Sequence, residues 1–109
     1  MEIKMARLKS KENGDCIKIA CENVIENIDW LFCYAYVMGQ GELSNTRILH
    51  AWNEFGDVVF DNSNGNSAII RKEKYYEIAK IKEKDVTKQT NDEILRLMFE
   101  TKTYGGWIN

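Results

Sequence analysis

Proline is absent from this 109-residue sequence, histidine occurs once, and no apolar run is long. Without proline, repeats or a low-complexity stretch there is no linker, and the length suits one core, so we expect a single domain over residues 1–109. The longest apolar run, Trp30 to Met38, is far too short to cross a bilayer. Residues 1–8 lack the apolar segment and cleavage site of a secretory signal. We therefore expect a cytoplasmic protein that does not contact a membrane.

A block of charges of one sign is missing too, and the formal net charge is −2. A nucleic-acid binder usually carries a concentrated basic stripe, whereas the most basic stretch here, residues 71–74, is interrupted by Glu73. No nucleic-acid partner is therefore indicated. The three cysteines are an odd number without an export signal, so a disulfide framework is not expected. Their spacing matches no zinc pattern and only one histidine could complete a site, so the sequence predicts neither a metal nor a cofactor.

The pattern of apolar residues predicts an α+β fold. Helical spacing predicts a helix over residues 15–28, with Asp15 as its N-cap. Apolar segments bounded by turn formers predict five strands, over residues 29–38, 46–53, 57–61, 67–71 and 75–81, with loops at 39–45 and 61–66. A capping-box motif at Thr90–Glu93 predicts a last helix that ends near Tyr104, with Gly105 or Gly106 as its C-cap. We expect the first helix to pack on an antiparallel sheet centred on the first two strands.

The second and third of these strands form a predicted hairpin that brings the histidine beside a carboxylate. If Phe55-Gly56 is a two-residue turn, counting back along both strands places His50 directly opposite Asp61, on the same face of the sheet. A carboxylate beside an imidazole can fix its tautomer and stabilise the imidazolium that forms during proton transfer. We therefore predict a His50–Asp61 pair, with Asn62 as the alternative orienting residue.

A nucleophile is the missing partner of this pair, and Cys16 suits the role. It stands at the start of the first predicted helix, where the helix dipole and the free N–H groups stabilise a thiolate. The same N–H groups could act as an oxyanion hole. Cys33 is the alternative, although it lies among the aromatic residues of a strand, and Cys21 fits the core face of the helix. Several aromatic residues are predicted to shield or line the site without a chemical role: Trp52, Tyr75, Tyr76 and Trp107.

Two segments resemble the papain-like and transglutaminase-like cysteine enzymes. Residues 14–20, Gly14-Asp15-Cys16-Ile-Lys-Ile-Ala20, are similar to the G-x-C-x-x-x-A start of the nucleophile helix in that superfamily. Residues 49–61 resemble its HAWn…g.vvfD hairpin, and the chain order of Cys, His and Asp also matches. The resemblance covers about residues 13–66. It implies a small papain/transglutaminase-like domain, of the kind that a phage or mobile element carries. Cys16 would be its nucleophile, His50 its general base and acid, and Asp61 its orienting carboxylate.

The function that this resemblance implies is a thiol hydrolase or acyl transferase with a catalytic triad. An enzyme of this kind attacks an amide, ester or glutamine carbonyl of a protein or peptide substrate and forms an acyl-enzyme without a cofactor. It could act as a protease, a deamidase or a transglutaminase. The alternative is a catalytically inactive binding or inhibitor module on the same fold. A purely structural domain is the remaining interpretation if the hairpin register is wrong.

Overall fold

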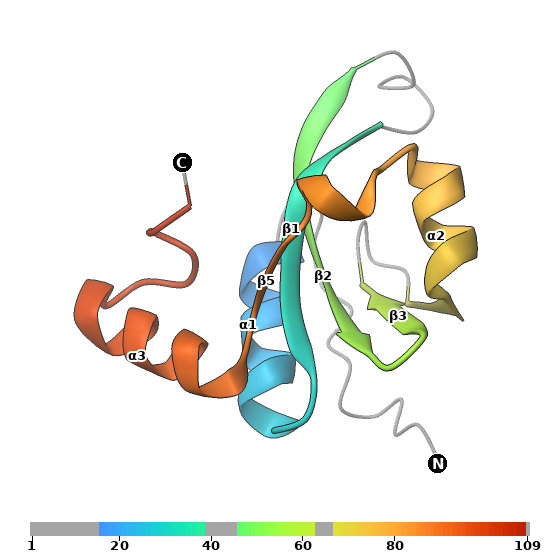
Figure 1. Ribbon diagram of the computed structural model, residues 1–109. Helices are drawn as coiled ribbons and strands as arrows, with labels where there is room; N and C mark the ends of the chain where they lie inside the picture. The colour runs from blue at the N-terminus through green and yellow to red at the C-terminus, as the bar shows by residue number, and fades with distance from the viewer. Residues whose placement is uncertain (1–15, 39–45, 63–66, 109) are drawn as a thin grey trace.

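The computed structural model describes residues 16–38, 46–62 and 67–108 (Figure 1). Its elements, in chain order, are α1 (Cys16–Glu26), β1 (Leu31–Met38), β2 (Arg47–Phe55), β3 (Val58–Asp61), β4 (Ala68–Arg71), α2 (Lys72–Ala79), the 3-10 turn η4 (Glu83–Asp85), β5 (Thr87–Gln89) and α3 (Asn91–Thr101). The five strands lie in the order β4-β3-β2-β1-β5, and each neighbouring pair is antiparallel. The predicted α+β class is confirmed, with a helix on an antiparallel sheet that has β1 and β2 near its centre.

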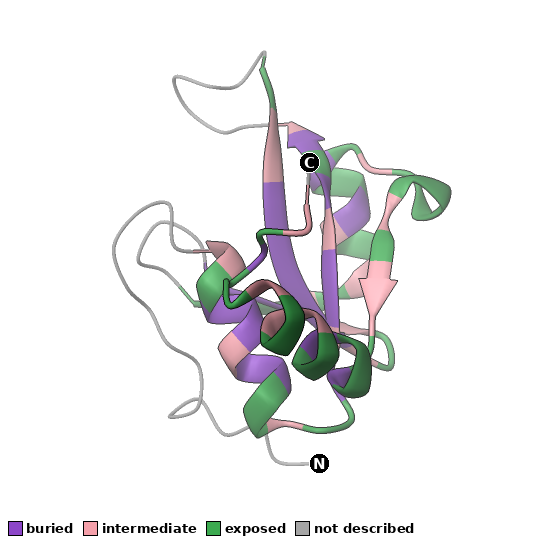
Figure 2. Cartoon of the chain, turned by 90° about the vertical axis from the view of Figure 1, so that its left-hand side faces the viewer, coloured by how far each residue is buried: buried purple, intermediate pink, exposed green. Residues whose placement is uncertain are grey.

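Helices cover both faces of the sheet, α1 and α3 on one side and α2 on the other (Figure 1). Side chains alternate between the faces along a strand, so Phe32 and Ala51 pack with α1 and α3, whereas Cys33 and Trp52 pack with α2. Burial is concentrated in β1, β2 and β3 and on the inward sides of the helices (Figure 2), whereas β4 and β5 contain no buried residue. The molecule therefore has two cores that share one sheet.

Helix α1 packs through a short apolar stripe rather than the longer one that was predicted. Its core residues are Ala20, Cys21 and Val24, with Ile17 packed against them, and these positions fall at helical spacing and end at Val24. The helix stops at Glu26, and Ile28, predicted as part of its apolar face, is 72% exposed beyond the helix end. The predicted N-cap, Asp15, lies outside the described residues, as do the predicted loop at 39–45 and most of the loop at 61–66.

The fifth predicted strand, residues 75–81, is wrong, because residues 75–79 belong to helix α2. Its buried residues, Tyr76 and Ala79, are three apart, which is a helical spacing. Lys80 ends the helix in the left-handed conformation, at φ 55°. The fifth strand is instead Thr87–Gln89, which pairs with β1 at one edge of the sheet.

Helix α3 begins as predicted, and its predicted end is wrong. The Thr90 hydroxyl accepts the Glu93 N–H and the Glu93 carboxylate accepts the Thr90 N–H, which completes the capping box. The helix ends at Thr101, and Lys102 is its left-handed C-cap at φ 58°, so neither glycine caps it. Gly105 has a different role. At φ +85° it lies so close to Ile17 of α1 that a Cβ there would approach the Ile17 side chain to 2.4 Å.

The β2–β3 hairpin has a different turn from the predicted one. The two loop residues are Gly56 and Asp57, and Phe55 pairs with Val58. Gly56 has φ +57°, and a glycine in the first central position is what a type II′ hairpin turn requires. The pairing is consequently shifted by two residues from the predicted register, and His50 does not lie directly opposite Asp61.

Candidate active site

His50 on β2 and Asp61 at the end of β3 form a buried hydrogen-bonded pair. The His50 Nε2 lies 2.9 Å from the Asp61 Oδ2, and each residue is 8% exposed. Because a shift of two residues keeps every side chain on its face, the predicted contact survives the error in register. The prediction that the two side chains lie within hydrogen-bond reach is confirmed, as a diagonal pair rather than a direct one.

Cys16, the first residue of α1, lies on the other side of this histidine. Its sulfur is hydrogen-bonded to the His50 ring and to the backbone N–H of Ala51. Since Nε2 of His50 faces Asp61, the other ring nitrogen, Nδ1, is left to face Cys16. The three residues that were predicted from the sequence are therefore brought together in the order Cys16, His50, Asp61.

The end of the β2–β3 ladder explains how a residue of α1 reaches a histidine on the opposite face of the sheet. Among the described residues, the pairing of β2 with β3 ends at Asn53 and Phe60. In a two-residue hairpin the closing pair exchanges both backbone hydrogen bonds, so every second residue back from Phe55 aims its N–H toward β3. Ala51 is one of these residues. Its N–H lies beyond the end of the ladder and bonds to Cys16 instead of a strand.

The charges of this site favour a thiolate beside an imidazolium. Burial alone raises the pKa of Cys16, but the hydrogen bond and charge of His50 outweigh it, so the pKa lies below its ordinary value. Burial likewise lowers the pKa of His50, but the hydrogen bonds and charges of Asp61 and Cys16 raise it to about 9. The lowered pKa of Cys16 and the raised pKa of His50 both favour transfer of the thiol proton to the imidazole.

Two aromatic side chains on the α2 side of the sheet enclose the pair. Trp52 stacks beside the His50 ring, with centroids 6.1 Å apart and planes 27° from parallel. Tyr75 of α2 donates a hydrogen bond of 2.5 Å from its hydroxyl to the Asp61 Oδ2. The sequence interpretation gave Tyr75 no chemical role, because large aromatic side chains usually belong to the core. The sequence carries no signal for the Tyr75–Asp61 contact, because Tyr75 lies outside the hairpin motif.

The alternative site residues have other surroundings. Cys33 and Cys21 are fully buried and unpaired. Burial raises the pKa of Cys21 to about 12, and burial followed by the charge of Glu54 raises the pKa of Cys33 further. Asn62 does not touch the histidine: it accepts from Asn23 and donates to Ser67. Of the predicted alternatives, none is placed to act with His50.

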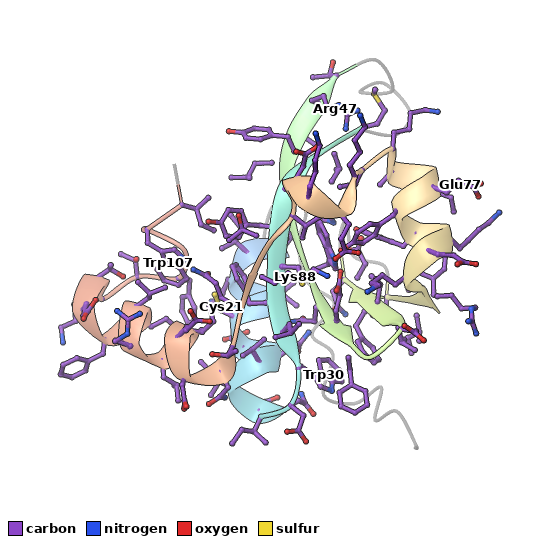
Figure 3. All side chains as sticks on the ribbon, viewed as in Figure 1. Cys21, Trp30, Arg47, Glu77, Lys88 and Trp107 are labelled. Carbon is purple, nitrogen blue, oxygen red and sulfur yellow. The ribbon has the colours of Figure 1, made fainter. Side chains whose placement is uncertain are left out.

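A second polar cluster lies on the α2 side of the sheet around Glu54, which is 2% exposed. The Glu54 carboxylate accepts hydrogen bonds from Trp52 and Tyr76, at 3.0 and 2.5 Å, and pairs with Lys88 at 3.0 Å. Lys88, which is labelled in Figure 3, lies on β5. It also pairs with Glu83 of η4. The cluster ties β2, α2, β5 and η4 together and neutralises a buried charge, so we interpret it as structural.

No known protein family, curated protein or solved structure matches this chain. The superfamily expected from the Cys, His and Asp motifs therefore stays a prediction. Within residues 16–38, 46–62 and 67–108, no group of three or more histidine, cysteine, aspartate or glutamate side chains is placed to hold a metal ion. In the same ranges no helix has the length and apolar character needed to span a membrane.

Proposed function

We propose that this protein is a cysteine-nucleophile hydrolase or acyl transferase in which Cys16, His50 and Asp61 act as a catalytic triad. The observation that carries the proposal is a single buried imidazole hydrogen-bonded on one side to a cysteine sulfur and on the other to a carboxylate. A histidine with a structural role needs only one hydrogen-bond partner. A histidine that acts as the base of a catalytic triad needs two, the nucleophile and the orienting carboxylate.

The first half of the reaction is acylation of Cys16. The Cys16 thiolate attacks the carbonyl carbon of the substrate, and the carbonyl electrons move to the oxygen. The backbone N–H groups at the start of α1 point outward along the helix axis and suit this oxyanion. When the intermediate collapses, the bond to the leaving group breaks and the imidazolium Nδ1 gives that group its proton. A thioester on Cys16 remains.

The second half releases the acyl group. Neutral His50 takes a proton from water or from an amine, which attacks the thioester carbon, and Cys16 leaves as a thiolate. Water gives a carboxylic acid, as in a protease or deamidase, and an amine gives a new amide, as in a transglutaminase. Asp61 holds the ring by its Nε2–H throughout, which keeps Nδ1 directed at the sulfur. The substrate that fits this chemistry is an amide, ester or glutamine carbonyl of a protein or peptide.

Alkylation of the thiol tests the site without a known substrate. At pH 6 an ordinary thiol is almost wholly protonated, so iodoacetamide should label Cys16 at least about tenfold faster than a free cysteine does. Mass mapping should find Cys21 and Cys33 unlabelled in the folded protein, because both are buried. His50→Gln should slow the labelling of Cys16, since it removes the cation that favours the thiolate. Asp61→Asn should slow it less, because Asp61 acts through the histidine.

The matched control is Asp57→Asn, which neutralises an exposed carboxylate at the turn of the same hairpin and should leave the labelling rate unchanged. Labelling of Cys16 only above about pH 8, at a rate that His50→Gln does not alter, would mean that no thiolate–imidazolium pair exists. The catalytically inactive binding module would then be the better interpretation of the fold.

A further inference from the structure

Tyr75 contacts the triad from helix α2, which covers the opposite face of the sheet from α1 and α3. Its hydroxyl hydrogen bond ends on the Oδ2 of Asp61, the same oxygen that accepts from the Nε2 of His50. We infer that Tyr75 is a positioning residue of the triad, which sets how strongly Asp61 holds the His50 imidazolium by sharing that oxygen. The inference rests on the proposed function, because it concerns the same site.

The Tyr75 hydroxyl acts only as a donor in this position. Burial, together with the nearby charge of Asp61, raises the pKa of Tyr75 far above its ordinary value, so the hydroxyl keeps its proton at any working pH. Its O–H points at the carboxylate at 2.5 Å, a length typical of a charge-assisted bond. Tyr75 therefore draws part of the Asp61 charge away from the histidine.

The groups that face His50 come from three elements besides its own strand. Cys16 approaches from α1, Asp61 from β3, and Tyr75 reaches Asp61 from α2, while Trp52 of β2 stacks beside the ring. Of these, Cys16 and Asp61 raise the pKa of His50. Removing the Tyr75 hydroxyl leaves more of the Asp61 charge to the imidazolium and should stabilise it further.

The next residue supplies a matched control. Tyr76 donates an equally short hydrogen bond, also 2.5 Å, but its acceptor is Glu54 in the second cluster. Tyr75→Phe and Tyr76→Phe thus remove the same hydroxyl from adjacent positions of α2 and deprive a buried carboxylate of one donor. They differ in which carboxylate is affected.

His50 is the only histidine of the chain, so its imidazole signals can be followed by NMR without assignment. In Tyr75→Phe the titration midpoint of His50 should rise above the wild-type value by about half a pH unit or more. The pH at which iodoacetamide labels Cys16 at half its maximal rate should fall in the same variant. Both variants should lose thermal stability, because each leaves a buried carboxylate without one donor. Tyr76→Phe should nevertheless leave both midpoints at the wild-type values.

Each outcome bears on one of the two proposals. Midpoints in Tyr75→Phe that match those of Tyr76→Phe, or a His50 midpoint that falls, would overturn the role of Tyr75 and leave the triad standing. A wild-type His50 that titrates near 6.5 together with an ordinary Cys16 would overturn the triad itself. If Tyr75→Phe does not fold, Tyr75→Met, which keeps an apolar side chain but also lacks the hydroxyl, provides the same comparison.

Discussion

At the level of single residues, the three cysteines have the same side chain, but their thiols differ in reactivity because their surroundings differ. Cys16 lies half-buried at a helix start and meets an imidazole, so its pKa lies below the ordinary value. Cys21 and Cys33 lie in the two cores, where burial raises the pKa of each thiol, and the charge of Lys88 near Cys33 is outweighed there by burial and the charge of Glu54. Cys21 is labelled in Figure 3, on α1 beside α3. One reactive and two inert thiols follow from these positions.

Replacing either core thiol should lower the free energy of unfolding and have little effect on the labelling rate of Cys16. Cys21→Ala and Cys33→Ala each leave a small cavity in a closed core and should lower the free energy of unfolding by roughly 1–2 kcal/mol. Urea unfolding measures this loss, and mass mapping measures the labelling rate of Cys16 in the same variants. If Cys33→Ala abolished activity on a substrate while Cys16→Ala preserved it, the nucleophile would be Cys33.

Among the elements, α2 and β5 are held to the centre of the sheet by one buried carboxylate. Glu54→Ala removes the acceptor of Tyr76 and Trp52 and leaves the ammonium of Lys88 without one of its two carboxylates. We expect a loss of about 3 kcal/mol or more in the free energy of unfolding, because buried partners are left unsatisfied. The comparison is Glu100→Ala, which breaks an exposed pair with Arg96 on α3 and should cost under about 0.5 kcal/mol. Equal losses in urea unfolding of the two variants would contradict a structural role for the cluster.

The helices and strands that could be predicted are those with a strong local signal. β1 is a continuous apolar run, and α3 opens with a complete capping box, so both were located from the sequence. The prediction for α2 was wrong because the aromatic pair Tyr75-Tyr76 and the following Ile78 favour a strand. The charged first turn that makes the segment a helix, Lys72-Glu73-Lys74, was left out of the predicted element.

The candidate site was predictable as far as the side-chain period of a strand allows. His50 and Asp61 share a face in the predicted and in the observed register, since the two differ by an even number of residues. The turn itself held the missing signal: Gly56 suits the first central position of a two-residue loop, whereas the prediction placed it second. Neither Tyr75 nor the Ala51 N–H could be predicted, because both contacts depend on tertiary packing and on where the β2–β3 ladder ends.

For the whole molecule, the shifted pKa of His50 makes stability depend on pH. The pKa rises from an ordinary 6.5 to about 9 on folding, so the contribution of His50 is fully present below about pH 6.5 and is lost as the pH rises through about 9. The lowered pKa of Cys16 acts in the opposite sense, and its contribution is lost as the pH falls. Cys16→Ser removes that second effect.

In the Cys16→Ser background, the stability difference between His50 and His50→Gln should therefore shrink as the pH rises. Burial lowers the pKa of His50 in that background, and we expect the hydrogen bond and the charge of Asp61 together to outweigh it. Urea unfolding at pH 6, 7.5 and 9.5 measures the difference, which changes by about 1.4 kcal/mol for each unit of pKa shift that remains. A difference that grows with pH would show that the folded site disfavours the imidazolium.

The way α2 is attached has a consequence for local unfolding. Only two of the eight residues of this helix are buried, and it lies on the opposite face of the sheet from the core that α1 and α3 share. An element with so little buried apolar surface detaches at a lower free energy than the central strands unfold. When it detaches, the hydroxyls of Tyr75 and Tyr76 leave Asp61 and Glu54 in one event, and water reaches both carboxylates while the strands are still paired. The hydrogen bond from Tyr75 to Asp61 is therefore less stable than the fold, and heat or denaturant should break it in molecules whose sheet is still native.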